Sequence, residues 1–274
     1  MSFVLSAGET SGDALGAALA DALRRRLGDS DLAGVTGPAM RAGGIESIET
    51  IDALDVMGLF EVIGHLPRLV RLRRALRSAI RDRRPRAFVG IDAPDFNLGL
   101  ARGLKRDGIP TAHLVAPSVW AWRGYRINKI ARSLDLLLTL FPFEPDCFAG
   151  TGLDCRFVGH PLADALPQSP DRAAARHDLD LPADRPIVAL LPGSRGGEIG
   201  RHAALLAETA ARVGRDRPDV ELVVLLAREN QREAFCNAAG ARAVENLRIV
   251  TDRTRTGLTA ADVALAASGT VTLE

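Results

Sequence analysis

Short apolar segments alternate with amphipathic, helix-like segments along most of this 274-residue chain. The first apolar run, FVLSA at 3–7, precedes a helical pattern over 12–27 in which Leu15, Leu19 and Leu23 share one face. Similar apolar runs occur at 87–92, 111–116, 134–141, 155–160, 186–191, 220–227, 247–250 and 262–266. Apolar runs separated by helices are typical of βαβ units, whose parallel strands are buried on both faces. The sequence therefore predicts an α/β fold with parallel sheets.

The segment 163–186 interrupts this alternation. It carries four prolines and many charged residues but no long apolar stretch, which is typical of a connection between domains. A chain of this length is able to bury two cores. We therefore expect two Rossmann-like lobes, one over 1–165 and the other over 166–274.

Composition is ordinary for a soluble globular protein, with 47% hydrophobic residues, 25% charged residues and a net charge of +1. This charge balance does not favour nucleic acid as a partner. The three cysteines lack metal-ligand spacing, which favours free thiols in a reducing compartment. The start of the chain has no signal-peptide pattern, and no apolar run is long enough to span a bilayer. We expect a cytoplasmic protein.

Four polar clusters lie where predicted strands end: GETSGD at 8–13, DAPD at 92–95, GHP at 159–161 and PGSR at 192–195. In open α/β sheets, ligands bind outside the carboxyl ends of the strands. Asp92 directly follows a buried strand, where a carboxylate is well placed to accept a proton, so it is the candidate general base. Asp95 is expected to cap the following helix. In GETSGD, the alternative to a ligand site is a helix cap formed by Ser11 or Asp13.

The PGSR cluster joins a predicted strand to a predicted helix through a glycine, a hydroxyl and an arginine. Backbone N–H groups at a helix N-terminus favour anions, glycine allows close approach, and arginine matches phosphate oxygens. The cluster therefore predicts a phosphorylated ligand; the alternative is a surface ion pair between Arg195 and Glu198. The chain has neither a dinucleotide fingerprint nor a P-loop sequence. Two D-x-D triplets, Asp29–Asp31 and Asp178–Asp180, fall in loops after helices, so we expect no metal and no other cofactor.

Residues 56–86 combine a basic stripe with an apolar one. Nine arginines fall between Arg68 and Arg86 against a single acid, Asp82, and apolar residues recur there at helical spacing. Such a helix either binds an anionic membrane surface or packs on the sheet with a solvated basic face. The residues expected to dock are Leu59, Phe60, Leu66, Arg68, Leu69, Arg71, Arg73 and Arg74.

The two tryptophans, Trp120 and Trp122, follow another predicted strand in a chain with only 4% aromatic residues. Core packing is the default expectation for side chains of this kind. Their position after a strand end leaves contact with a substrate open as the alternative.

Eight strings of the sequence match one family in order: AGETSGD, VMGLFEVIGHLPRL, VGIDAPDFN, PSVWAWR, LFPFE, VGHPL, LLPGSR followed by EI, and SGTVTLE. They run from residue 7 to residue 274, and their combination is specific. The chain resembles the lipid-A-disaccharide synthases, which are glycosyltransferases with two Rossmann-like lobes of the GT-B type. Members of this family continue beyond the last motif, so the resemblance implies an incomplete second lobe here.

The resemblance implies an inverting transfer from UDP-2,3-diacylglucosamine to 2,3-diacylglucosamine 1-phosphate, which gives UDP and the lipid A disaccharide 1-phosphate. It implies that Asp92 takes the proton of the acceptor hydroxyl and that Arg195 stabilises the leaving diphosphate without a metal. It also implies acceptor contacts for Glu9 and Ser11. The residues expected to bind UDP are Gly193, Ser194, Arg195, Ser268, Gly269, Thr270 and Glu274.

Because both of these substrates carry acyl chains, the resemblance further implies peripheral docking on the anionic inner face of the inner membrane. Two other functions fit the same residues. A UDP-sugar transferase that acts on another lipid acceptor would share the donor site. A membrane-docked, nucleotide-binding fragment without turnover would bind vesicles or UDP but form no disaccharide.

Overall fold

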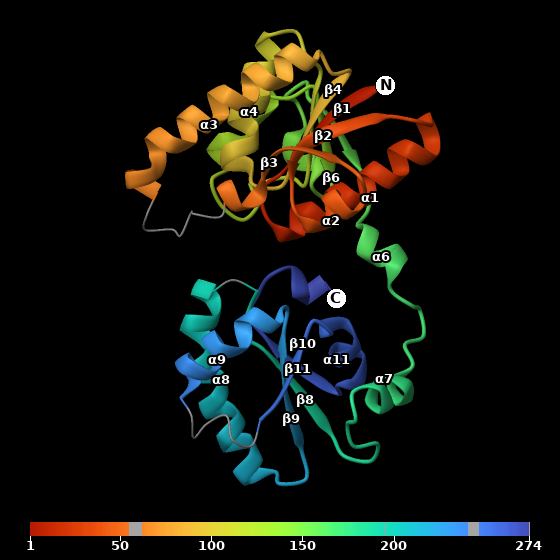
Figure 1. Ribbon diagram of the computed structural model, residues 1–274, viewed down its shortest axis with the longest axis vertical. Coiled ribbons are helices and arrows are strands. Elements are labelled where there is room, and N and C mark those ends of the chain that lie inside the picture. Colours follow the sequence, from red (N-terminus) through yellow and green to blue (C-terminus); the bar gives the residue numbers. More distant parts are fainter. Residues whose placement is uncertain (55–61, 195, 241–246, 274) are drawn as a thin grey trace. The chain divides into compact units, whose positions relative to one another are not determined.

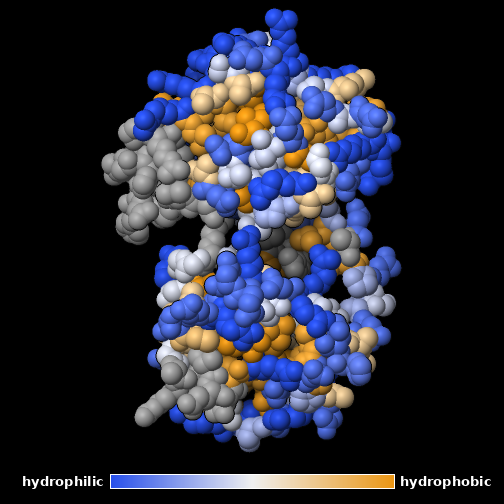
Figure 2. Space-filling model, in the orientation of Figure 1, coloured by the Kyte–Doolittle hydropathy of each residue, from blue (hydrophilic) through white to orange (hydrophobic). Residues whose placement is uncertain are grey.

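The computed structural model describes residues 1–54, 62–194, 196–240 and 247–273, with the backbone alone described at 62–69, 165, 270 and 273. The chain forms two compact units, Met1–Ala163 and Asp164–Glu274, each with a parallel sheet between helices (Figure 1). The predicted α/β class is thereby confirmed. On the face drawn in Figure 2, hydrophobic residues gather toward the middle of each unit and hydrophilic residues surround them. Within the ranges that the structure describes, no helix is both long and apolar enough to cross a membrane.

The first unit is built on a seven-stranded sheet in the order β3-β2-β1-β4-β5-β6-β7. Its strands are β1 (Ser2–Ala7), β2 (Asp31–Thr36), β3 (Glu46–Thr50), β4 (Ala87–Ile91), β5 (Thr111–Leu114), β6 (Leu136–Thr139) and β7 (Asp154–Phe157). All neighbouring strands pair in parallel. The central strands are apolar on both faces, and Leu5, Phe88 and Ile91 are wholly buried. Two of the strands, β2 and β3, lie in a stretch for which the apolar pattern predicts none.

Helices cover both faces of this sheet, with α1 and α2 on one face and α3 and α4 on the other (Figure 1). The helices of the unit are α1 (Thr10–Leu27), α2 (Pro38–Ala42), α3 (Val62–Arg83), α4 (Pro94–Arg106) and α5 (Ile127–Ala131), with the short 3₁₀ helices η1 (Ile51–Ala53), η2 (Gly124–Arg126) and η3 (Pro145–Phe148). Phe96, Leu100 and Leu104 of α4 are buried at a spacing of four residues, so α4 presents one apolar stripe to the sheet.

The second unit has a four-stranded parallel sheet in the order β10-β9-β8-β11. Its strands are β8 (Ile187–Leu191), β9 (Glu221–Leu226), β10 (Arg248–Thr251) and β11 (Val263–Ala266). Its helices are α7 (Arg172–Asp178), α8 (Gly196–Asp216), α9 (Arg232–Ala239) and α11 (Thr254–Ala260), and α6 (Pro161–Ala165) lies at the boundary of the two units in the sequence. The unit also has the 3₁₀ helices η4 (Glu229–Gln231) and η5 (Thr270–Leu273). Alternate strand residues face two separate cores. Leu190 and Val224 pack with α8 and α9, whereas Leu191 and Val223 pack with α7 and α11.

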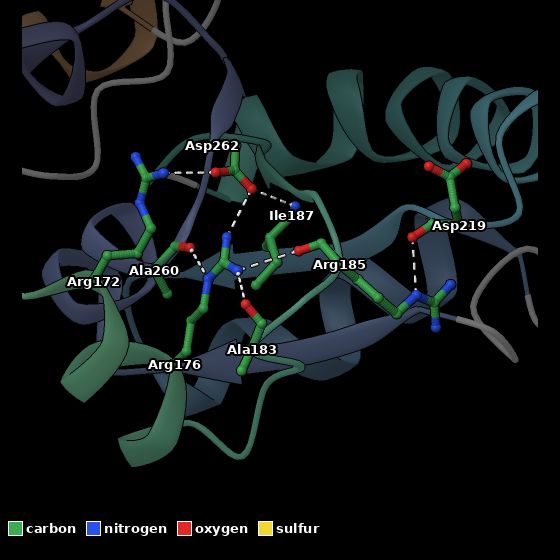
Figure 3. Close-up of polar contacts among 8 residues, drawn as sticks. All are labelled: Arg172, Arg176, Ala183, Arg185, Ile187, Asp219, Ala260 and Asp262. Atoms are coloured by element: carbon green, nitrogen blue, oxygen red, sulfur yellow. Dashed lines mark hydrogen bonds and ion pairs between the residues drawn. The ribbon is translucent and has the colours of Figure 1, made fainter.

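A polar network around Asp262 fixes α7 to this sheet (Figure 3). Arg176 of α7 donates to Asp262 Oδ2 at 2.7 Å and to the carbonyl of Ala260 at 3.1 Å. Asp262 also accepts from the Ile187 amide at 2.8 Å and from Arg172 at 2.7 Å. The Ile187 amide and then the two guanidinium groups hold the pKa of Asp262 below its ordinary value. The carboxylate therefore joins α7 to the first residue of β8.

Candidate active site

A pocket of about 220 Å³ opens in the first unit at the carboxyl ends of β4 and β5. One of the two loops that line it begins at Asp92, and the other begins at Val115. This edge is where open α/β sheets bind their ligands. The lining residues are Asp92, Pro94, Asp95, Val115, Ala116, Pro117, Ser118, Val119, Trp122, Arg123 and Arg126.

The backbone that carries Asp92 is strained. Asp92 and Ala93 have φ angles of 53° and 42°, in the left-handed region that residues other than glycine seldom adopt. Gly8 makes room for this turn, because a Cβ at Gly8 would lie 2.0 Å from the Cβ of Ala93. Such strain persists only where the surroundings hold it, and it is common at functional sites.

Buried Asn97 is the residue that holds this turn. Its Nδ2 lies 2.9 Å from the carbonyl oxygen of Asp92 and 3.0 Å from that of Ser6, and its Oδ1 accepts from the Ser6 hydroxyl at 2.7 Å. These contacts tie the turn after β4 to the neighbouring strand β1. Asn97 stands in the VGIDAPDFN string, but the sequence pattern predicted no role for it.

The structure brings together three of the predicted site residues, Glu9, Ser11 and Asp92. Oδ1 of Asp92 accepts from the Ala93 amide at 2.8 Å. The Ser11 hydroxyl lies 3.3 Å from Asp92 Oδ2 and 2.9 Å from Glu9 Oε1, so its single proton is shared between two carboxylates. All three side chains are partly exposed, so the carboxylates are open to a ligand.

His113 lies on β5 beside this turn and is wholly buried. Burial lowers the pKa of His113 to about 4, although the negative charge of Asp92 acts in the opposite direction. The ring is therefore neutral at neutral pH. It fits because its neighbour on β4 is Gly90, where a Cβ would lie 2.7 Å from His113 Nδ1. Nothing in the sequence pattern identified this histidine.

The loop after β5 brings positive charge and an indole to the pocket. Arg126 forms an ion pair with Asp95 at 2.5 Å, and the Arg123 guanidinium lies 3.9 Å from the centre of the Trp122 ring. The prediction that Asp95 caps the following helix is wrong, since Ala93 is the N-cap residue and no side chain caps that end. Core packing of the tryptophans is also wrong, because Trp120 and Trp122 are 55% and 59% exposed.

The GETSGD cluster divides between two tasks. Neither Ser11 nor Asp13 caps α1, whose N-cap residue is Glu9. Asp13 is buried and instead caps α2 from a distance. Its carboxylate accepts from the amides of Gly37 and Ala39 at 2.8 and 2.7 Å. Ser11 contacts Glu9 and the pocket residue Asp92, whereas Asp13 has a structural role.

Only some of the arginines in the basic stripe of α3 are exposed to solvent. Arg71 and Arg74 are exposed. The Arg73 guanidinium lies 5.2 Å from the centre of the Phe96 ring and donates to the carbonyl of Asp95 at 3.1 Å. Arg73 therefore packs against α4, contrary to its expected membrane contact. Leu59 and Phe60, and the side chains of Leu66, Arg68 and Leu69, lie outside the part of the chain that the structure describes.

In the second unit, the predicted phosphate cluster forms the turn between β8 and α8. Gly193 has a φ of 119°, and a Cβ there would lie 2.6 Å from the Cβ of Glu198. The Ser194 amide donates to Glu198 Oε2 at 3.0 Å, and the Ser194 carbonyl accepts from Gln231 at 2.7 Å. The backbone amide expected to help bind a diphosphate is thus already paired within the unit. Arg195 lies outside the described residues.

The predicted donor loop follows β11. Ser268 and Gly269 are exposed there, and the Gly269 carbonyl accepts from the amide and hydroxyl of Thr272 at 3.0 and 2.6 Å. Thr270 begins η5, with its side chain outside the described part, and Glu274 is wholly outside it.

Comparison with known proteins identifies one family. A family model described as lipid-A-disaccharide synthetase matches residues 3–274. The lipid-A-disaccharide synthase of Pseudomonas aeruginosa is 47% identical over 270 residues, which are 98% of this chain and 71% of that protein. The synthase of Alkalilimnicola ehrlichii is 48% identical over 277 residues, 100% of this chain and 72% of that protein. The chain thus spans about 71% of the length of these relatives.

Solved structures of similar fold are more distant in sequence. UDP-GlcNAc 2-epimerase from Neisseria meningitidis, bound to UDP-GlcNAc, has a TM-score of 0.67 and 10% identity, with 98% of this chain and 78% of that chain covered. MurG from Acinetobacter baumannii has a TM-score of 0.52 and 15% identity, with coverage of 99% and 73%. At these identities the likeness supports the two-unit fold alone.

Proposed function

Because the chain belongs to the lipid-A-disaccharide synthase family, we propose that the pocket of its first unit holds the acceptor of a glycosyl transfer and that Asp92 is the general base. Members of the family join a UDP-sugar to a lipid acceptor. The proposed donor is UDP-2,3-diacylglucosamine and the proposed acceptor is 2,3-diacylglucosamine 1-phosphate. The products are the lipid A disaccharide 1-phosphate and UDP.

The proposed mechanism is a single displacement. The acceptor hydroxyl gives its proton to Asp92 while its oxygen forms a bond to the anomeric carbon of the donor sugar. The bond from that carbon to the diphosphate oxygen breaks, and its electron pair stays on UDP. Because no covalent enzyme intermediate forms, the configuration at the anomeric carbon is inverted.

The observation that carries this proposal is the arrangement of Asp92 on the pocket wall. Oδ1 is engaged by the Ala93 amide, whereas Oδ2 faces the Ser11 hydroxyl at 3.3 Å, a long and replaceable contact. An acceptor hydroxyl is able to take that place, because Ser11 keeps its shorter contact of 2.9 Å with Glu9. Glu9 and Ser11 then hold the acceptor sugar beside the base.

The second unit is proposed to bind the donor. The N-terminus of α8 and the Arg195 side chain would stabilise the negative charge that develops on the leaving diphosphate. Glu198, which accepts from the Ser194 amide, is the group that a diphosphate oxygen would displace there. The remaining proposed UDP contacts are Gly193, Ser268, Gly269, Thr270 and Glu274.

We also propose peripheral docking on the inner face of the inner membrane. Arg71 and Arg74 are exposed on the described part of α3, and the adjoining Val70 is 36% exposed; these side chains support the proposal. The sequence pattern alone supports membrane contacts for Leu59, Phe60, Leu66, Arg68 and Leu69. Arg73 is left out of the proposed membrane contacts because it packs against α4.

The test of the proposed function is product formation by the purified chain with both acylated substrates in detergent. We expect UDP and an acylated disaccharide with a β-linkage, as shown by the anomeric proton coupling. A product from a donor that lacks acyl chains, at the same rate, would favour a transferase for another lipid acceptor. UDP binding by a folded chain without any product would identify a nucleotide-binding fragment.

A further inference from the structure

Exposed apolar side chains of the first unit gather at one edge of its sheet. Nine large apolar side chains are exposed among those that the structure describes in this unit, and six of them follow β5 or β6 or lie at the end of β7. These six are Trp120, Trp122, Tyr125, Phe143, Phe157 and Val158. Single exposed apolar side chains are common on folded proteins, whereas a cluster of them usually marks a binding surface.

The central members of the cluster contact one another. The rings of Trp120 and Phe143 meet edge to face with centroids 5.5 Å apart, and Phe141 stacks on Phe143 at 5.7 Å. Trp122 lies two residues further along and lines the pocket that contains Asp92. We call Trp120, Trp122, Phe141 and Phe143 the aromatic ledge. It forms an apolar continuation of the pocket, whose lining includes four charged side chains.

A buried carboxylate fixes the shape of the ledge. Glu144 is 4% exposed and accepts from the amides of Leu140 and Phe141 at 3.1 and 3.0 Å. Burial raises the pKa of Glu144, against the effect of these two amides. Burying a carboxylate costs free energy, and here the carboxylate holds the turn in which Phe143 is 45% exposed. The ring is therefore presented to solvent by a rigid turn, which lowers the entropy lost on binding.

We infer that the aromatic ledge binds an acyl chain of the lipid acceptor while the sugar of that acceptor occupies the pocket. This inference rests on the proposed function. A ligand that fits both surfaces must be polar at one end and hydrocarbon at the other, as an acylated sugar phosphate is. Arg123, stacked on Trp122 where pocket and ledge meet, is a suitable partner for its phosphate.

The charges around the ledge favour a single lipid molecule over a membrane surface. Arg123 and Lys129 are exposed there, but so are Asp95 and Asp146. An anionic bilayer attracts a surface whose charges are mainly positive. The exposed arginines of α3 supply such a surface, whereas the edge around the ledge carries charges of both signs.

The test uses intrinsic fluorescence, because Trp120 and Trp122 are the only two tryptophans of the chain and both belong to the ledge. The probes are 2,3-diacylglucosamine 1-phosphate below its aggregation concentration, glucosamine 1-phosphate, and vesicles of anionic phospholipid. We expect a saturable blue shift with the acylated probe alone. Phe143→Ala, which keeps both tryptophans, should raise the Kd of that probe on the order of tenfold. Leu205→Ala, which removes an exposed apolar side chain from α8, should leave the Kd unchanged.

The other outcomes contradict the inference. An equal shift with glucosamine 1-phosphate would mean that the tryptophans report the sugar, and an equal shift with vesicles would make the ledge a membrane contact. The absence of a fluorescence shift with all three probes would mean that the ledge does not bind the acyl chain. A parallel assay for disaccharide separates the two proposals. If disaccharide forms but the fluorescence shift does not depend on the acyl chains, only the proposed role of the ledge is contradicted. If the shift depends on the acyl chains but no disaccharide forms, only the proposed transferase function is contradicted.

Discussion

Gly8 and Ala93 approach so closely that a Cβ at Gly8 would lie 2.0 Å from the Cβ of Ala93. Gly8 directly follows β1, and Ala93 follows the proposed base Asp92, so this contact joins the turn after β1 to one of the loops that line the pocket. We predict that Gly8→Ala destabilises the first unit by about 2 kcal/mol, a typical overpacking effect. Urea unfolding followed by tryptophan fluorescence measures it. Gly124→Ala, where the added Cβ would lie 3.7 Å from the Val119 carbonyl, is the control expected to show little change.

Asn97→Ala should destabilise the first unit and also slow turnover. It leaves the Ser6 hydroxyl and the carbonyl groups of Ser6 and Asp92 without their partner, a loss of about 2 kcal/mol. It also releases the strained turn that positions the Asp92 carboxylate. Unfolding and kcat are measured on the same preparation, with exposed Asn128→Ala as the control. An unchanged kcat in a folded Asn97→Ala protein would show that the turn at Asp92 keeps its conformation without Asn97.

His113 should make the first unit sensitive to acid. Its folded-state pKa of about 4 lies below the ordinary value of 6.5, so between these values the unfolded chain binds a proton that the folded chain does not. Stability is therefore fully present above about pH 6.5 and falls toward pH 4, by on the order of 3 kcal/mol. His113→Gln should lose this part of the pH dependence of unfolding. Exposed His177→Gln should keep it, and equal slopes in the two variants would contradict the assignment.

Membrane docking predicts a difference between two pairs of exposed arginines. The double change Arg71→Gln and Arg74→Gln on α3 should weaken binding to anionic vesicles about thirtyfold, at roughly 1 kcal/mol for each charge. The matched double change Arg102→Gln and Arg106→Gln removes the same charge from α4. Sedimentation with vesicles measures both. Equal losses would mean that net charge, and not the α3 surface, governs binding.

The alternation of apolar runs and helical patterns was sufficient to predict the class of the fold, because strands buried on both faces are nearly continuous apolar segments. It was not sufficient for β3, the edge strand of the first sheet, which has exposed polar residues at its start and no apolar run. Edge strands bury little, so their sequences resemble those of loops.

The site was predictable where a polar residue follows a strand directly, as Asp92 does. Asn97 and His113 were not, because their roles depend on contacts between segments far apart in the chain. Asn97 bonds to Ser6, 91 residues away. Asp13 likewise caps a helix 24 to 27 residues further along, although its sequence position suggested a cap for its own helix. Hydrogen bonds of this kind follow from the packing of the elements and leave no local pattern.

The role of Asp92 as the base is tested most directly by the kcat of Asp92→Asn for disaccharide formation. The control is Asp21→Asn, which changes an exposed carboxylate of α1. Both variants should have the unfolding free energy of the parent within about 1 kcal/mol. We predict that Asp92→Asn lowers kcat about a hundredfold to ten-thousandfold, the range for loss of a general base, while Asp21→Asn retains the parent value. A kcat for Asp92→Asn close to that of Asp21→Asn would contradict the role of Asp92 as the base.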